Sequence, residues 1–266
     1  MVPAATYEVT IGDYDFTDVL RIETTSALET IYDLGEVQLD NADGNVPELL
    51  KGDPVQIRLG YVGAGTVMCL IGTATDVRRG RVVRVDVADP AYVLRTPVTR
   101  AWRNPDPGDI ARAVLEPHGL ALQMGSQSVA RRPHWVAHGA TGAAVLRGVA
   151  RAWNLDWSLY FDASEGAIWW GPWASSPRVL KSKAAVMFTA PSDFAVWQPA
   201  EVGQRGHCTL ALARPDLGHS TVLGVLDEAF GATPMVLRAD RVRHVLEADN
   251  PKVPAYRTEV EWTRLV

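Results

Sequence analysis

A run of alternating apolar and polar residues between positions 49 and 94 limits most strongly what this chain can fold into. Its first strand, expected at residues 55–59, places three apolar side chains on one face and Gln56 and Arg58 on the other. A Gly-rich turn, an apolar run and a second tight turn then lead into a return strand at residues 83–87. The stretch predicts a β-meander that buries only one of its faces.

The residues before this meander also predict strands. Residues 7–11 alternate, residues 18–24 contain three large apolar side chains, and residues 36–40 alternate cleanly before a group of turn formers. Together with the meander this gives about six strands before Pro97 and no convincing helix. We therefore expect residues 1–97 to form a first β-barrel, closed or nearly closed.

The pattern changes after Pro97. Asp106 is placed to cap a short helix with Pro107 at its first position, and Thr141 precedes a second helix whose apolar face extends to Trp153. A Trp-rich hairpin at residues 157–170 follows. We expect residues 98–188 to form a small α+β unit.

Strands return in the last part of the chain. Apolar or alternating segments occur at residues 208–213, 235–237, 242–246 and 256–264. The closing pair of these segments resembles the first meander in outline, which hints at duplication of one barrel. The sequence thus predicts a mainly β chain, in which a second, similar β-barrel at residues 189–266 and the first one flank the central unit.

Composition excludes several classes of function. The chain has 266 residues, 47% of them hydrophobic, and a net charge of -5 without a basic block, which argues against nucleic acid as its main partner. It has no apolar stretch long enough to span a bilayer and no signal peptide, so we expect it to be made in a cytoplasm without membrane insertion. Cys69 and Cys208 are expected to be buried free thiols.

A search for catalytic chemistry finds little, and we predict a protein that is not an enzyme. The sequence has no nucleophile elbow, zinc-protease motif, phosphate-binding loop or dinucleotide fingerprint. His134 and His138 have helical spacing, but no third metal ligand is close in sequence. His207 and Cys208 are adjacent on an expected strand and should point to opposite faces. We predict no catalytic residue, no cofactor and no metal site.

Two further groups have alternative interpretations. Asp13, Asp15 and Asp18 cluster near the start, where turn and strand-edge roles explain them better than a cation site. The Trp-rich stretch at residues 169–173 would suit stacking on sugars if exposed, although large aromatic residues in a hairpin are more often core. A protein that binds or hydrolyses glycans through this unit therefore stays open as the alternative function.

The polar faces of the expected barrels are the most informative feature. Solvation alone would explain them, but a surface between assembled subunits would have the same alternation. The polar residues that we select on these faces are Glu36, Gln38, Asp40, Gln56, Arg58, Arg84, Asp86, Arg257, Glu259 and Glu261.

The order of short motifs along the chain resembles phage tail baseplate hub proteins, a group that includes the late control D proteins and the hub half of type VI secretion spike proteins. Each match is degenerate, and together they cover nearly the whole chain. The matching segments are residues 50–61, 71–77 and 85–89, Leu94, Trp102-Arg103-Asn104, Asp109-Ile110-Ala111, Gly119-Leu120, Thr141, Leu146, Ala150, Trp153, Val242-Arg243-His244 and Tyr256-Arg257-Thr258.

The resemblance implies a structural role at the tail tip or baseplate of a virion or of a phage-like injection machine. Hubs of this group form homotrimers, in which two tube-like barrels per subunit give a pseudo-sixfold ring. The resemblance implies that the polar residues selected above form the candidate ring or lumen surface. The ring joins the hexameric tail tube protein to a spike or tip protein, contacts baseplate wedge proteins, and passes the tape-measure protein and then DNA. The sequence carries no appended lysozyme, peptidase or needle domain, so wall digestion and membrane piercing are expected of other proteins.

Overall fold

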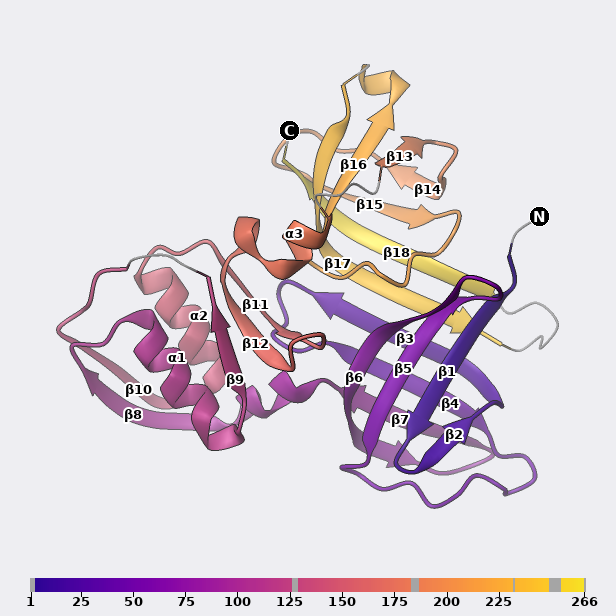
Figure 1. The fold of residues 1–266 in the computed structure, drawn as a ribbon, viewed down its shortest axis with the longest axis horizontal. Helices are drawn as coiled ribbons and strands as arrows, with labels where there is room; N and C mark the ends of the chain where they lie inside the picture. The colour runs from indigo at the N-terminus through magenta and orange to yellow at the C-terminus, as the bar shows by residue number, and fades with distance from the viewer. Residues whose placement is uncertain (1–2, 126–128, 183–186, 232, 249–254, 266) are drawn as a thin grey trace.

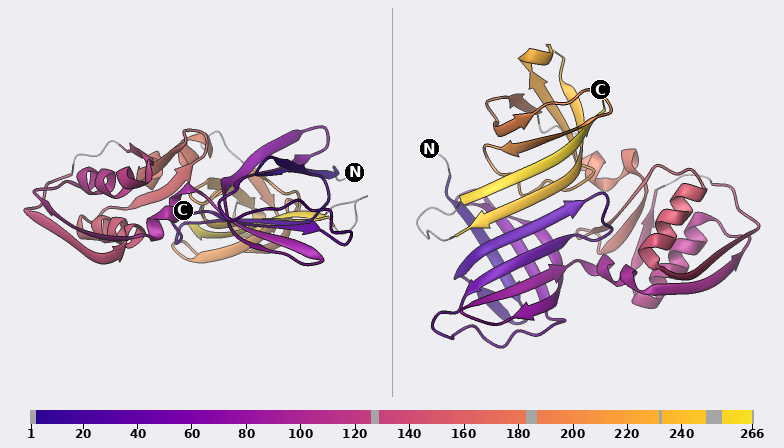
Figure 2. Two further views of the ribbon diagram at one scale, coloured as in Figure 1. Left: turned by 90° about the horizontal axis from the view of Figure 1, so that it is seen from below. Right: turned by 180° about the vertical axis from the view of Figure 1, so that it is seen from behind.

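The structure, a computed structural model, describes residues 3–125, 129–182, 187–231, 233–248 and 255–265. Two β-barrels lie side by side and a central α+β unit projects to one side of them (Figure 1). Figure 2 shows the same arrangement from below and from behind, with the central unit as a separate lobe. The expected fold class, two barrels flanking an α+β unit, is confirmed.

The first barrel is built from the predicted meander and the strands before it. Its apolar core contains the alternating residues that the sequence assigns to one face, among them Val55, Ile57, Leu59, Val83 and Val85, each at most 1% exposed. Its strands are β1 (Ala5–Ile11), β2 (Tyr14–Phe16), β3 (Val19–Ala27), β4 (Leu34–Asp40), β5 (Pro54–Tyr61), β6 (Gly65–Arg78) and β7 (Val82–Ala88).

These strands curl into two walls that pack against each other. The hydrogen-bonded order is β3-β4-β7-β6-β5-β1-β2, and β6 is long enough to pair with β5 through its first half and with β7 through its second. A Cβ atom on Gly35 of β4 would lie 2.5 Å from the end of the Leu70 side chain of β6, so the two strands face each other across the core and a larger residue there would displace this side chain. Strands β4 and β7 therefore form one wall, and β5 and β1 the other.

A short 3-10 helix, η1 (Pro90–Arg95), links the first barrel to the central unit. The sequence predicts no helix before Pro97. The Asp89 carboxylate caps this one, because it accepts a hydrogen bond from the backbone N–H of Ala91 at 2.9 Å, and Pro90 occupies the first helical position. This helix is a correction to the predicted elements, and its cause is local capping.

The central unit begins with both predicted helices. Asp106 and Asp109 form a capping box at the start of α1 (Pro107–Leu115), and the Thr141 hydroxyl caps α2 (Gly142–Ala152), which confirms both predicted starts. The helices cover one face of a two-stranded ribbon. The adjoining elements are η2 (Glu116–His118), β8 (Pro97–Arg103) and β10 (His134–Thr141).

The Trp-rich hairpin forms the other side of this unit. Strand β11 (Trp157–Asp162) pairs with β12 (Ala167–Pro172), as predicted, and β12 also pairs in parallel with β9 (Ala121–Met124), which the sequence did not predict. Two short helices, η3 (Trp173–Ser175) and α3 (Pro177–Ser182), then lead to the second barrel.

The second barrel contains more strands than the sequence predicted. The two expected segments at residues 235–237 and 242–246 are one strand, β17, because a bulge between Ala239 and Arg241 interrupts the alternation without ending the pairing. Strands β13, β14 and β16 were missed. The elements are β13 (Met187–Ala190), β14 (Phe194–Gln198), β15 (Arg205–Leu210), β16 (Val222–Asp227), η4 (Glu228–Phe230), β17 (Met235–Glu247) and β18 (Ala255–Arg264).

The two barrels share one sheet. Strand β17 pairs antiparallel with β3 over seven residue pairs, from Arg241 with Ala27 to Glu247 with Arg21. This pairing gives a 13-stranded sheet with the continuous order β15-β18-β17-β3-β4-β7 across both barrels. We refer to the β3–β17 junction as the seam.

Arg178 of α3 connects all three parts behind the seam. Its guanidinium donates to the Ser26 hydroxyl at 3.2 Å, to Asp33 at 3.2 Å and to the carbonyl of His219 at 3.4 Å, and it lies 3.9 Å from the ring centroid of Tyr160. The central unit is thereby held against both barrels. No helix among the described residues is both long and apolar enough to cross a membrane.

Candidate functional site

A continuous charged face covers the outer side of the shared sheet on β7, β4, β3, β17 and β18. On each of these strands polar residues alternate with core residues, so the charged side chains of five neighbouring strands meet on one surface. Because β3 and β17 belong to different barrels, the face extends across the seam without a break.

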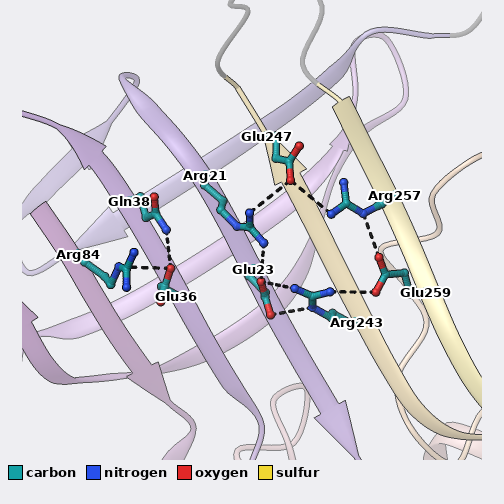
Figure 3. A network of polar contacts seen from close by, with 9 residues as sticks. All are labelled: Arg21, Glu23, Glu36, Gln38, Arg84, Arg243, Glu247, Arg257 and Glu259. Atoms are coloured by element: carbon teal, nitrogen blue, oxygen red, sulfur yellow. Dashed lines mark hydrogen bonds and ion pairs between the residues drawn. The ribbon is translucent and has the colours of Figure 1, made fainter. Parts of the chain in front are cut away.

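Six residues at the seam form a closed ring of alternating charge, which we call the hexad. Arg243 binds Glu23 through two hydrogen bonds of 2.7 Å and Glu259 through one of 3.0 Å. In the same way Arg21 bridges Glu23 and Glu247, and Arg257 bridges Glu247 and Glu259, over 2.9 to 3.3 Å. The hexad is Arg21, Glu23, Arg243, Glu247, Arg257 and Glu259 (Figure 3).

Val245 lies at the centre of the hexad. It shares the outward face of β17 with Arg243 and Glu247, and it pairs with Glu23 on one side and Arg257 on the other. Although it points away from the barrel cores, its exposure is 0%. The stems of the surrounding charged residues therefore cover it, and the hexad excludes water from the middle of the seam.

Contacts within the hexad shift the pKa values of several of its members. Hydrogen bonds from Arg243 lower the pKa of Glu23, and this outweighs the effect of partial burial. Partial burial alone would raise the pKa of Glu259, but hydrogen bonds from Arg257 and Arg243 lower it overall. The pKa of Arg243 is raised, mainly by its hydrogen bonds to Glu23. Glu23, Glu259 and Arg243 thus stay charged at neutral pH.

The rest of the face continues the pairing. Arg84 on β7 lies 3.5 Å from Glu36, which accepts a hydrogen bond from Gln38 at 2.6 Å (Figure 3). Arg78 binds Asp86 at 2.6 Å, and Arg241 lies 3.4 Å from Glu261. Each arginine of the face named here has a carboxylate partner, so the surface has the charge pattern of a neutralised wall and not that of a nucleic-acid-binding stripe.

A hollow of about 790 Å³ lies over this face at the end nearest η1. Charged residues of the sheet line its floor, and Tyr32, Tyr92 and Arg95 line its end. The face is therefore concave in this region.

Seven of the ten predicted surface residues lie on this one face. Their strands come from both barrels, and the sequence alone did not predict that the two strand groups would be joined. The seven are Glu36, Gln38, Arg84, Asp86, Arg257, Glu259 and Glu261.

The other three predicted residues lie outside the ion-paired part of this face. Asp40 continues the alternation of Glu36 and Gln38 at the exposed end of β4 and accepts a hydrogen bond from the backbone N–H of Ala42 at 3.0 Å. Gln56 and Arg58 are on β5, in the opposite wall of the first barrel, where Arg58 lies 3.3 Å from Glu8. They share the alternation of the charged face but not its location.

Sequence reasoning missed the members of the hexad on β3 and β17. Arg21, Glu23, Arg243 and Glu247 flank buried residues in the same alternating way as the residues that were chosen. The signal was present, because Arg241 and Arg243 alternate with Val242 and His244. Only the pairing of β3 with β17 shows that these residues meet.

The other candidate sites have structural explanations. The Thr10 hydroxyl donates to Asp15 at 2.6 Å, and within the described ranges no group of three or more His, Cys, Asp or Glu residues is placed to hold a metal ion. Cys208 is buried and His207 points to the opposite side of β15, as expected. Burial raises the pKa of the Cys208 thiol to about 12, so this thiol is no nucleophile at neutral pH.

The tryptophans do not form a sugar-binding platform. Trp169 is 6% exposed and Trp170 is 1% exposed, so both are core residues. Trp173 is partly exposed, and its indole N–H donates to the single carboxylate of Asp156 at 3.0 Å. A glycan-binding or hydrolytic site would need exposed rings beside paired carboxylates, and these three residues do not provide one.

Comparisons with solved structures show the same architecture in other proteins. The 43 kDa tail protein of prophage MuSo2 from Shewanella oneidensis has a TM-score of 0.73 at 12% identity, with 98% of each chain covered. A tail protein from Neisseria meningitidis has a TM-score of 0.70 at 12% identity, covering 98% of this chain and 96% of the other.

A third similar structure comes from a secretion system. The E. coli c3393 protein, a type VI secretion component with structural similarity to the bacteriophage T4 tail proteins gp27 and gp5, has a TM-score of 0.64 at 15% identity and covers 97% of this chain and 77% of the other. No protein-family model and no curated protein matches the sequence. The chain has the fold of phage tail proteins, which the type VI secretion component shares. At the level of the fold, this likeness confirms the resemblance to baseplate hubs.

Proposed function

We propose that this chain is the structural hub of the baseplate or tail tip of a phage or phage-like injection machine. Three copies would form a pseudo-sixfold ring that joins the hexameric tail tube to the central spike or tip. The observation that supports this proposal is the continuous charged face. It exists because the pairing of β3 with β17 joins the two barrels in one curved sheet. Three such sheets supply six barrels, which matches a sixfold tube on one side and a threefold spike on the other.

The charged face would be the inner wall of this ring. It is concave, it continues across the seam, and its arginines are already paired with carboxylates. A wall of this kind presents no unpaired guanidinium from these residues to phosphate, so DNA or an extended polypeptide could pass without being held. The assigned residues would be those of the hexad with Glu36, Gln38, Arg84, Asp86 and Glu261.

The proposed partners follow from this position. They are two further copies of the chain, the tail tube protein, the spike or tip protein and the baseplate wedge proteins, with the tape-measure protein and DNA as transient occupants of the channel. The protein would be located in the tail tip of the particle. Its role would be structural, without catalysis.

Mass measurement of the purified chain, alone and with its tube protein, tests the proposal. Three times 29.0 kDa predicts a species of about 87 kDa that also binds tube or spike protein. A stable monomer that binds neither protein would contradict the hub assignment. Genes for tail tube and tape-measure proteins beside the gene for this chain would be an independent supporting observation.

A further inference from the structure

The first half of β6 is an unpaired sheet edge. Residues 65–73 pair with β5, whereas pairing with β7 begins only at Thr73. Among the described residues, positions 65–71 make no backbone hydrogen bond outside the β5 ladder. Backbone N–H and C=O groups of alternate residues on this half of the strand are therefore free to pair with another strand.

Two features that normally prevent strand addition are missing, since the segment Gly65-Thr-Val-Met-Cys-Leu-Ile-Gly72 has no charged residue and no proline. A bulge at Cys69 interrupts the pairing with β5, and the Cys69 thiol donates to the carbonyl of Pro215 at 3.5 Å. Of the other ends of the sheet among the described residues, β2 has three residues and contains Asp15, β13 has four and is followed by Pro191, and β14 has five without a charge. Soluble proteins rarely leave a long uncharged edge open, since it pairs with other chains. We therefore expect this edge to be covered in the working assembly.

The edge lies in a cleft of about 800 Å³ where the three parts of the molecule meet. Consecutive residues 67–71 form one wall, and residues 214–218 of the second barrel form the opposite wall. Figure 1 shows β6 at the side of the first barrel that faces the β11–β12 turn. Consecutive lining residues indicate that the backbone edge, and not one face of the strand, borders the cleft.

The polar groups of the cleft indicate what kind of segment it accepts. Arg214 binds Asp216 at 2.6 Å and Arg178 binds Asp33 at 3.2 Å, so these charges are already neutralised. Paired charges and a backbone edge without a neighbouring strand favour an uncharged backbone as the occupant.

The volume fits a short strand. One residue of a packed strand fills about 160 Å³, from a rise of about 3.3 Å, a strand spacing of about 4.8 Å and a sheet spacing of about 10 Å. The cleft of about 800 Å³ thus has room for about five residues. This length matches the part of the edge that lines the cleft, residues 67–71.

We propose that the cleft binds an extended, uncharged segment of another tail protein, which adds a strand to the first barrel along β6. The segment would have apolar side chains at alternate positions, and it would join the hub from the side opposite its charged face. The assembly in which it occurs rests on the hub function proposed above, whereas the free edge is a property of this chain alone.

Amide hydrogen exchange tests this inference in three samples. They are the purified chain in its own oligomer, the complete tail purified from producing cells, and the denatured chain as the reference. Residues 66–71 should exchange rapidly in the oligomer and at least about tenfold more slowly in the tail. Equal exchange in both would overturn the proposal. Protection already present in the oligomer would assign the edge to a second copy and would equally overturn it.

A pair of variants separates this inference from the hub function. Val67→Lys puts a charge on the free edge, and Val82→Lys makes the same change at another valine that is 40% exposed, as Val67 is. We expect Val67→Lys to abolish protection of residues 66–71 while ring formation and tube binding continue, and Val82→Lys to leave that protection unchanged. A wild-type chain that forms no ring and binds no tube protein would refute the hub proposal, whereas normal protection in the Val67→Lys tail would refute strand addition.

Discussion

Arg243 is the residue whose removal best tests how the two barrels are joined. Its guanidinium makes three hydrogen bonds to two carboxylates on strands of both barrels, and its side chain is 33% exposed. A hydrogen bond to a charged group contributes about 1.5–3 kcal/mol when buried, and an exposed ion pair about 0.2–1 kcal/mol. For this half-buried pair of contacts we expect Arg243→Met to cost about 2–3 kcal/mol.

The matched control is Arg58→Met on β5. Arg58 lies 3.3 Å from Glu8, with side-chain exposures of 40% and 62%, so its loss should cost less than about 0.5 kcal/mol. Urea unfolding followed by tryptophan fluorescence at pH 7.5 measures both variants. In a chain of this length the midpoint of thermal unfolding should fall by about 4–10 °C for Arg243→Met.

A double-mutant cycle makes the test specific. Arg243→Met and Glu23→Gln should be coupled by about 1 kcal/mol or more, and the coupling should shrink in 1 M salt because screening weakens half-exposed pairs. Equal losses for Arg243→Met and Arg58→Met, or additive effects of Arg243→Met and Glu23→Gln, would refute the view that the hexad holds the seam.

Three further predictions concern other parts of the fold. Burial lowers the pKa of His244 to about 4, below its unfolded value of 6.5. Between these pH values the unfolded chain binds more protons than the folded chain, so the free energy of unfolding falls as the pH falls. Between pH 7.5 and pH 5, the wild type should lose about 2 kcal/mol more of its free energy of unfolding than His244→Gln, as measured by unfolding curves. Gly72→Ala would place a Cβ 2.1 Å from a backbone carbonyl oxygen and should cost more than about 3 kcal/mol, whereas at Gly80 the nearest atom is 3.5 Å away and alanine should be tolerated, as thermal unfolding will show. Burial raises the thiol pKa of Cys69 and Cys208 to about 12. A thiol reagent at pH 8 should modify the buried Cys208 only after the chain unfolds, whereas Cys69 is only partly buried, which corrects the expectation of two buried thiols.

Local signals in the sequence were sufficient for most elements. The capping residues Asp106 and Thr141 fix the starts of α1 and α2 because their side chains accept hydrogen bonds from the first helical turn. The alternation in β4, β7 and β18 predicts which side chains are polar-facing, since successive residues of a strand point to opposite sides.

The information that was missing is non-local. Glu23 and Arg243 are 220 positions apart, and no periodicity indicates that their strands pair. For the same reason Gln56 and Arg58 could not be separated from Glu36 and Arg84, because alternation shows which residues face out but not which wall of a barrel carries them.

The hub assignment is tested most directly by a reconstruction of the tail tip that contains this chain. We expect three copies in a ring of six barrels. The hexad of each copy should lie on the wall of the central channel, and the β6 edge should lie away from this channel. A ring in which Arg243 and Glu259 lie on the outer surface, or a tail tip without three symmetric copies, would contradict it.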